Sequence, residues 1–236
     1  MRQPKTYYDL IHCKSRIAVF QGGTRSGKTR SIINALCEWC YRYKDAGWVI
    51  TVVRKSFPSL RASVFRDFMT VLEEEGWYDE SNHNKTENTY ILFGTVWEFI
   101  STSEPQKLRG AKRNIVFMNE ANELDLESYR QILLRTTDKI ILDYNPSDEF
   151  HWIYDEVIPR DDASFYKSTY LDNPFLNAET INEIERLKET DENYWRVYGL
   201  GERGKSRATI FESAIYTELP EGCKPVAWGI DWGFSS

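Results

Sequence analysis

Residues 22–29 carry the pattern in this sequence with the clearest chemical meaning. They read Gly-Gly-Thr-Arg-Ser-Gly-Lys-Thr and match G-x-x-x-x-G-K-[ST] at every fixed position. The glycines let the backbone turn its N–H groups inward, where they can cradle the phosphates of a nucleotide. A lysine here faces the β- and γ-phosphates, and a threonine hydroxyl is a ligand for Mg²⁺. The pattern predicts an ATP site formed by Gly22, Gly23, Thr24, Arg25, Ser26, Gly27, Lys28 and Thr29.

A second candidate group follows an apolar run at 115–118. Loops of this kind are usually paired with a strand that ends in two acids, one for Mg²⁺ and one that polarises the attacking water. Here the first position is Asn119, whose amide oxygen can accept a hydrogen bond from a metal-bound water but adds no charge. Glu120 keeps the position of a general base. The alternative for Glu120 is a polar residue that merely ends a buried strand.

Two further side chains complete the predicted catalytic set. Asn145 follows the strand predicted over 139–144, so we expect it at the sheet edge where ligands gather in open α/β folds. At that edge the Asn145 amide is expected to sense the γ-phosphate or to hold the attacking water. The alternative is that Asn145 only forms the turn before Pro146. Hydrolysis also needs positive charge on the transition state. Either Arg25 supplies this positive charge within its own chain, or Arg54 or Arg61 supplies it to a neighbouring subunit. The sequence does not distinguish between these arrangements.

The elements that must position these residues are visible in the apolar pattern. Strands are expected at 17–20, 48–53, 115–118, 139–144 and 165–170, a helix at 60–72 and a hairpin at 90–100. Helical spacing also follows the glycine loop, so the helix turns its positive end toward the bound anion. These elements predict an α/β fold of the P-loop NTPase class (ASCE/RecA-like), with a mostly parallel sheet flanked by helices.

A change in composition divides the chain near residue 199. Residues 1–198 are expected to form the ATPase domain, and 199–224 a glycine- and charge-rich linker. Residues 225–236 contain an apolar run that resembles the opening strand of a further domain. Cys37 and Cys40 lie inside the helix after the loop with no second pair following, so core packing is favoured over a zinc site.

Composition and charge limit the location and the partners. The chain is 41% hydrophobic, yet no apolar run approaches the roughly 20 residues of a membrane span, and residues 1–5 do not show the apolar stretch expected of a signal peptide. A cytoplasmic location is the default. The net charge is −6, but residues 1–113 hold 18 basic against 12 acidic residues. The basic clusters Arg54–Arg66 and Lys107–Arg113 are expected to contact a DNA backbone, unless they are only solvated surfaces.

Taken together, the motifs resemble those of the large terminase subunits of tailed bacteriophages. The matching segments are residues 20–29, 53–55, 107–110, 119–123, 145–146 with 151–152, 198–202 and 229–234. The resemblance implies an ATP-driven motor that moves double-stranded viral DNA into a procapsid through a portal. It also implies an RNase H-like nuclease domain that cuts the DNA concatemer with two metal ions, of which 225–236 is the truncated start.

The resemblance further implies roles for individual residues. Lys28 binds phosphate, Thr29 binds Mg²⁺, Glu120 is the catalytic base, and Asn145 couples hydrolysis to motion. Asp231 matches the first metal-binding carboxylate of the nuclease, but we expect no DNA cleavage by this chain because the nuclease needs further carboxylates. Asn119 stands where the family usually has an acid, which is expected to weaken the Mg²⁺ site. The family often reads adenine with a glutamine upstream of the glycine loop. In this chain that glutamine is either Gln3 at a displaced position, or Tyr7 or Tyr8 stacks on the base instead.

The implied partners are double-stranded DNA, a portal protein, a small terminase subunit and copies of the same chain in a ring. The implied location is the host cytoplasm, transiently on the procapsid portal, without a membrane. Two alternatives remain: another P-loop translocase such as a helicase, and a nucleotide-binding structural module without turnover. A helicase would be expected to show a second RecA-like domain, and Asn119 favours the module. ATP hydrolysis stimulated by duplex DNA separates both alternatives from packaging.

Overall fold

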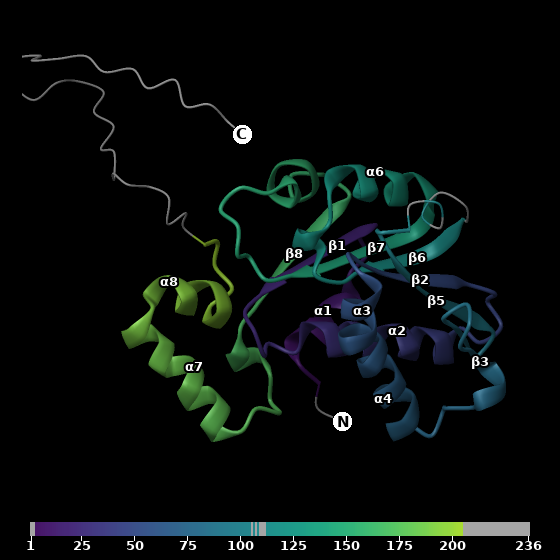
Figure 1. The fold of residues 1–236 in the computed structure, drawn as a ribbon, viewed down its shortest axis with the longest axis horizontal. Helices are drawn as coiled ribbons and strands as arrows, with labels where there is room; N and C mark the ends of the chain where they lie inside the picture. Colours follow the sequence, from purple (N-terminus) through teal and green to yellow (C-terminus); the bar gives the residue numbers. More distant parts are fainter. Residues whose placement is uncertain (1–2, 105, 107, 109–111, 205–236) are drawn as a thin grey trace, which may run out of the picture. The chain divides into compact units, whose positions relative to one another are not determined.

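The computed structural model describes residues 3–104, 106, 108 and 112–204 (Figure 1). Its strands are β1 (Ile17–Gly22), β2 (Val49–Arg54), β3 (His83–Asn84), β4 (Thr89–Leu92), β5 (Thr95–Ser101), β6 (Arg113–Met118), β7 (Thr136–Tyr144) and β8 (Ala163–Ser168). Its α-helices are α1 (Lys5–His12), α2 (Lys28–Arg42), α3 (Phe57–Leu60), α4 (Arg66–Glu74), α6 (Leu126–Arg135), α7 (Ala178–Thr190) and α8 (Glu192–Tyr194). Single π turns are η1 (Arg61–Phe65), η4 (Ile153–Val157) and η6 (Trp195–Gly199), and 3₁₀ turns are η2 (Glu80–Asn82), η3 (Ala121–Glu123) and η5 (Tyr170–Asp172).

The strands form one sheet in the order β3-β4-β5-β2-β6-β7-β1-β8. The pairs β5–β2, β2–β6, β6–β7, β7–β1 and β1–β8 are parallel, whereas β3–β4 and β4–β5 are antiparallel, so that β4 runs against the other strands. β7 lies between β1, which leads into the glycine loop, and β6, which leads into Asn119 and Glu120. The predicted α/β class with a mostly parallel sheet is confirmed. The three central strands therefore bring their carboxyl ends to one edge of the sheet.

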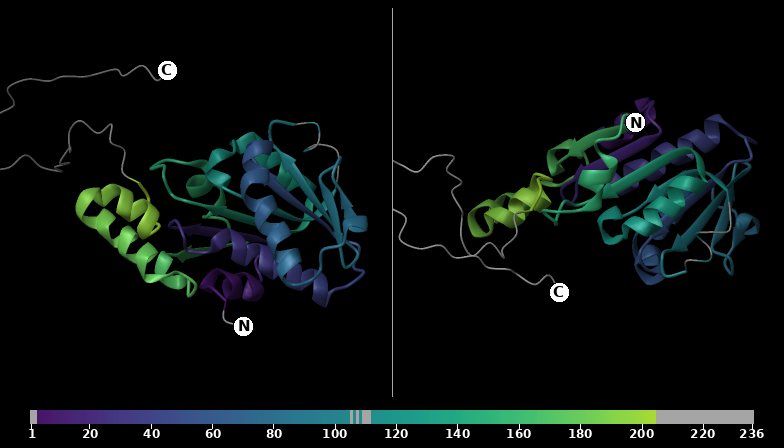
Figure 2. Two further views of the ribbon diagram at one scale, coloured as in Figure 1. Left: turned by 60° about the horizontal axis from the view of Figure 1, so that its bottom comes forward. Right: turned by 90° about the horizontal axis from the view of Figure 1, so that it is seen from above.

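Alternate residues of the central strands enter two separate cores. In β1, Ala18 and Phe20 belong to the core beneath α2 and α4, whereas Ile17 and Val19 belong to the core beneath α6 and η4. This alternation follows from the two-residue period of a strand and requires apolar residues on both faces. Figures 1 and 2 show the same layers, with α1, α2 and α4 on one face of the sheet and α6 on the other. The strand backbones are thus held from both sides.

Two local features depart from regular geometry. The hairpin between β4 and β5 turns at Phe93 and Gly94, with φ of 50° and 78°, the pair of left-handed residues that a type I′ turn needs. The helix predicted over 60–72 is not α-helical throughout. The α-helices α3 and α4 are joined end to end by η1, which is a π turn. The chain leaves α4 through Gly76, whose φ is 68°.

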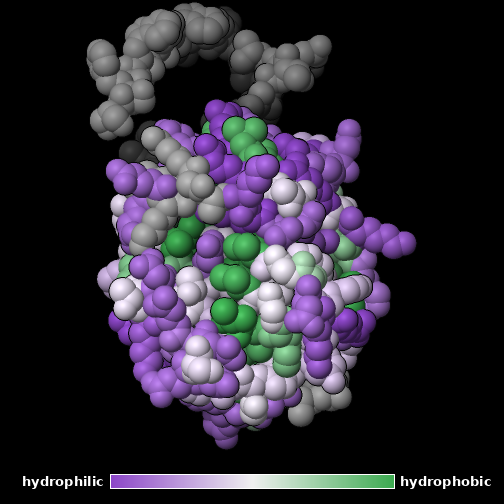
Figure 3. All heavy atoms as spheres, turned by 90° about the vertical axis from the view of Figure 1, so that its right-hand side faces the viewer, coloured by the Kyte–Doolittle hydropathy of each residue, from purple (hydrophilic) through white to green (hydrophobic). Residues whose placement is uncertain are grey.

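The sheet edge at β3 is short and mostly polar. β3 has two residues, which limits pairing of this edge with another chain. Figure 3 shows this side of the molecule, where a small apolar area is surrounded by hydrophilic side chains. Along the described part of the chain, no helix is both long and apolar enough to cross a membrane.

Candidate nucleotide site

The glycine loop joins the end of β1 to the start of α2, as the motif requires. Gly27 precedes α2 with φ of 80°, a conformation that favours glycine, and Arg25 is also left-handed at φ 63°. Ser26 Oγ donates to the Gly23 carbonyl at 2.9 Å and closes the loop. Because α2 begins at Lys28, the loop stands at a helix N-terminus, where free N–H groups attract anions.

The Lys28 side chain is buried at the loop. Its ammonium donates to the carbonyls of Gly22 and Gly23 at 2.9 and 3.0 Å and to Asn145 Oδ1 at 2.9 Å. Burial lowers the pKa of Lys28, and the charges of Asp143 and Glu120 partly offset that effect. The structure therefore brings Lys28 and Asn145 together, although 117 residues separate them in the sequence.

Three side chains and one backbone N–H meet beside the loop at the carboxyl ends of β6 and β7. Thr29 Oγ1 donates to Asp143 Oδ2 at 2.6 Å, and Asn119 Nδ2 donates to Asp143 Oδ1 at 2.9 Å and to Thr29 Oγ1 at 3.3 Å. The Glu120 N–H also donates to Asp143 Oδ1, at 3.0 Å. Thr29, Asn119 and Glu120 were predicted for this site. Asp143 was not, although an acid near the end of an otherwise apolar strand was its visible signal.

Glu120 occupies a conformation that is unusual for a residue with a side chain. Its φ and ψ are 50° and 56°, and its N–H bond to Asp143 helps to hold this turn. Burial, followed by the negative charge of Asp143, raises the pKa of the Glu120 carboxyl well above its usual value, against the opposing charges of Lys28 and Arg54. A carboxyl with a raised pKa is suited to accept a proton near neutral pH.

The candidate arginines have different surroundings. Arg25 is exposed and lines an open hollow of about 250 Å³ together with Lys28, Glu120 and Asn145. Arg54 is mostly buried and lies 3.7 Å from Glu123, and its guanidinium donates to the Ser59 carbonyl at 3.3 Å. Arg61 is exposed on η1. Arg25 is therefore placed at the site of its own chain, whereas Arg54 is held in contacts within its own chain.

The first residues of the predicted linker lie against the glycine loop. Thr24 N donates to the Tyr198 carbonyl at 2.6 Å, and Gln21 Nε2 donates to the Gly201 carbonyl at 2.7 Å. A Cβ on Gly201 would lie 2.7 Å from Gly22 Cα, so the two backbones need glycine to approach this closely. Residues 198–201 thus pack directly against the end of β1 and the start of the glycine loop. The rest of the predicted linker from 205, and the segment 225–236 with Asp231, lie outside the described residues.

The basic clusters are only partly available to a partner. Arg113 is 2% exposed and donates to the Leu108 carbonyl at 3.1 Å, and burial lowers its pKa, so the prediction that it contacts DNA is wrong. Lys107 and Arg109 lie outside the described residues. Lys55 follows the carboxyl end of β2 and Lys112 precedes the amino end of β6, so the two exposed lysines are roughly 25 Å apart along neighbouring strands.

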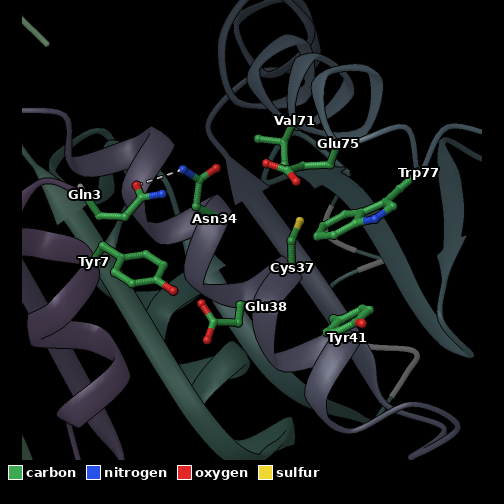
Figure 4. Close-up of a pocket in the computed structure, with 9 residues that line it drawn as sticks. All are labelled: Gln3, Tyr7, Asn34, Cys37, Glu38, Tyr41, Val71, Glu75 and Trp77. Atoms are coloured by element: carbon green, nitrogen blue, oxygen red, sulfur yellow. Dashed lines mark hydrogen bonds between the residues drawn. The ribbon is translucent and has the colours of Figure 1, made fainter. Parts of the chain in front are cut away.

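The residues considered for base recognition lie near the loop, on the α1 side. Gln3 Oε1 accepts a hydrogen bond from Asn34 Nδ2 at 3.2 Å, and Tyr7 lines the same hollow of about 180 Å³ (Figure 4). A neighbouring hollow of about 400 Å³ is lined by both Gln3 and Gly27. Tyr8 is 44% exposed and contacts the edge of Tyr7. Gln3 thus shares a hollow with the end of the loop, and its role in reading a base stays a prediction.

Comparison with known proteins gives a consistent set of relatives. Residues 14–202 match the family described as phage terminase large subunit. The PBSX phage terminase large subunit of Bacillus subtilis (strain 168) is 23% identical over 220 residues, which are 78% of this chain and 51% of that protein. The chain thus spans about half the length of the curated relative that it matches.

Solved structures of large terminases share the fold. The large terminase of a thermophilic bacteriophage matches 85% of this chain and 53% of its own, with a TM-score of 0.72 and 16% identity. Its complex with ATP-gamma-S matches with a TM-score of 0.70 at 17% identity, over 85% of this chain and 52% of its own. The large terminase ATPase domain of a Thermus phage matches 86% of this chain and 99% of its own, with a TM-score of 0.57 and 12% identity.

Proposed function

This chain belongs to the phage terminase large subunit family, and from that membership we propose that it hydrolyses ATP as part of a motor that moves double-stranded viral DNA into a procapsid. The observation that carries the proposal is the meeting of Lys28, Thr29, Glu120 and Asn145 at one edge of the sheet, beside the start of α2. Support for the nucleotide comes from the structural neighbour solved with ATP-gamma-S. The portal protein, the small terminase subunit, the ring of copies and the downstream nuclease domain belong to the same proposal.

In the proposed reaction, the loop binds and orients the triphosphate. The N–H groups at the start of α2 and the Lys28 ammonium face the phosphate oxygens, which takes Lys28 away from the carbonyls that it now contacts. Glu120 accepts the proton of the attacking water, and its buried position keeps the carboxyl poorly solvated until then. Asn145, released from Lys28, binds the water or the γ-phosphate. Arg25 stabilises the charge that develops on the transferred group.

Magnesium fits the same edge of the sheet. Among the described residues, Asn119 Oδ1 is buried without a hydrogen-bond partner, and the Thr29 hydroxyl lies 3.3 Å from the Nδ2 atom of the same side chain. Uncharged oxygens of this kind bind Mg²⁺ directly or through water. When bound, the ion neutralises the charge that builds up on the β- and γ-phosphates. Thr29 and Asn119 are thus the proposed holders of Mg²⁺ that the sequence indicated.

The proposed DNA contact uses the exposed basic residues near the carboxyl edge of the sheet. Lys55, Arg61 and Arg66 are exposed and follow the end of β2 within 12 residues. Contacts from such residues to the phosphate backbone need no particular base sequence, as a packaging motor requires.

The first test is nucleotide binding. Lys28→Ala is expected to weaken binding of a fluorescent ATP analogue at least about tenfold, because the variant loses a charge-assisted contact to phosphate. Lys14→Ala is the matched control, since Lys14 is exposed and lies just before the amino end of β1, whereas the glycine loop follows the carboxyl end. Binding is measured by fluorescence anisotropy, with thermal melting to verify the fold. Equal and negligible binding by the wild type and both variants would end the proposal.

A further inference from the structure

The two proposed holders of Mg²⁺, Thr29 and Asn119, carry no negative charge. Position 119 holds an amide, and the Thr29 hydroxyl is also neutral. Divalent magnesium is generally held in proteins by one or two carboxylates together with the phosphates of the substrate. A site with only neutral side chains would leave the ion dependent on the nucleotide.

A carboxylate, that of Asp143 in β7, lies beside Thr29 and Asn119. It is 1% exposed, and both its oxygens point at the residues of the site: Oδ2 accepts from Thr29 Oγ1 at 2.6 Å, and Oδ1 accepts from Asn119 Nδ2 at 2.9 Å. Oδ1 also accepts from the Glu120 N–H at 3.0 Å. A single side chain thus contacts the helix that follows the loop and both residues that follow β6. The contact depends on β7 lying between β1 and β6.

The hydrogen bonds leave oxygen lone pairs for a cation. The single Thr29 O–H is donated to Asp143, and one lone pair of that oxygen accepts from Asn119, so a second lone pair is left. A carboxylate offers about four lone-pair positions, of which the three bonds above use three. Asn119 Oδ1, a buried atom without a partner among the described residues, is the third oxygen. Thr29 and Asp143 therefore each keep an oxygen lone pair at the place where their side chains meet, and the Asn119 oxygen belongs to the amide that contacts both of them.

From this geometry we propose that Asp143 supplies the negative charge of the Mg²⁺ site, in place of the acid that Asn119 lacks. The proposal rests on the proposed function, since the ion accompanies the nucleotide. Asp143 acts on the ion directly or through a bound water, and through its hydrogen bond it fixes the Thr29 hydroxyl with its lone pair free. Asn119 is then an uncharged member of the site, and its amide nitrogen, which donates to Asp143, holds that carboxylate in place. Position 119 need not be acidic for turnover, which removes the main argument for a module without activity.

The experiment compares the wild type, Asp143→Asn, and the double variant Asn119→Asp with Asp143→Asn. The double variant has the wild-type charge but moves the carboxylate to position 119. Affinity for fluorescent ADP is measured with excess Mg²⁺ and with EDTA, and Mn²⁺ binding to the nucleotide complex is followed by electron paramagnetic resonance. These readouts do not depend on turnover. Melting temperatures show whether each variant folds.

We expect Asp143→Asn to keep the EDTA affinity within about threefold, to lose the gain in affinity that Mg²⁺ gives the wild type, and to bind Mn²⁺ at least tenfold more weakly. The double variant is expected to recover both. A normal Mg²⁺ gain and normal Mn²⁺ binding in Asp143→Asn would overturn the inference while leaving the proposed function intact. If Asp143→Asn does not fold, the double variant decides, because a folded double variant without the Mg²⁺ gain also overturns the inference. A wild type that binds no nucleotide overturns both proposals.

Discussion

Glu120→Gln is expected to bind ATP with nearly wild-type affinity and to hydrolyse it about 10²–10⁴-fold more slowly. The glutamine has nearly the same shape and can keep the backbone N–H bond to Asp143, so the loop and Lys28 stay in place. The amide cannot take the proton of the attacking water, which is a contribution made only in the transition state. The loss should therefore appear in the chemical step and not in binding.

Single-turnover hydrolysis of labelled ATP measures this step, and anisotropy of a fluorescent analogue measures binding. Glu123→Gln is the matched control, because it makes the same chemical change three residues further on, where the side chain lies beside Arg54. The control should hydrolyse ATP within a few-fold of the wild type. A Glu120→Gln variant that does the same would remove Glu120 from the role of general base.

Arg25→Ala is expected to slow hydrolysis by about 10³-fold or more, the usual effect of losing an arginine that stabilises phosphoryl transfer. Arg25 lines the same hollow as Lys28 and Glu120, so it can reach the transferred phosphoryl group within its own chain. Arg54 contacts Glu123 and Ser59 within the same chain, which makes it a poor donor to a neighbour. The sequence leaves open whether the arginine acts in its own chain or on a neighbouring subunit. The structure favours an arginine that acts in its own chain.

A mixing experiment distinguishes the cis and trans arrangements. Arg25→Ala is mixed with Glu120→Gln, and Arg61→Ala serves as the control for an exposed arginine outside the hollow. With Arg25 acting in cis, each of the two inactive proteins lacks a part of its own site, so no mixture regains activity at any protein concentration. Recovery in a mixture of Glu120→Gln with Arg25→Ala, or inactivity of Arg61→Ala that mixing repairs, would show that a neighbouring subunit supplies the arginine.

The sequence predicts the fold class and most of the site, because those features depend on local patterns. The glycine loop fixes Lys28 and Thr29 in place, and the rule that parallel strands end at one edge brings Asn145 to them without any knowledge of strand order. Asp143 could not be assigned in the same way. Its role depends on β7 lying between β1 and β6, and strand order is decided by long-range pairing that a single sequence does not display.

Burial explains the prediction that was wrong. Arg113 belongs to a basic run in the sequence, and a run of charges usually marks a solvated face. In the structure it is the first residue of β6 and is buried, with its guanidinium bonded to the Leu108 carbonyl. Residues 199–201, the start of the predicted linker, show a different ambiguity, since a glycine-rich composition resembles a linker and also permits the close backbone contact with the loop. Composition alone does not separate these two uses of glycine.

The central claim, ATP hydrolysis coupled to duplex DNA, is tested most directly by phosphate release from the wild type with duplex DNA, single-stranded DNA or none. We predict that duplex DNA raises the rate more than single-stranded DNA does. We also predict that Lys55→Glu with Arg66→Glu reduces this stimulation, whereas Lys14→Glu, at the opposite end of the sheet, does not. A rate that is the same under all three conditions, or stronger stimulation by single strands, would contradict the account.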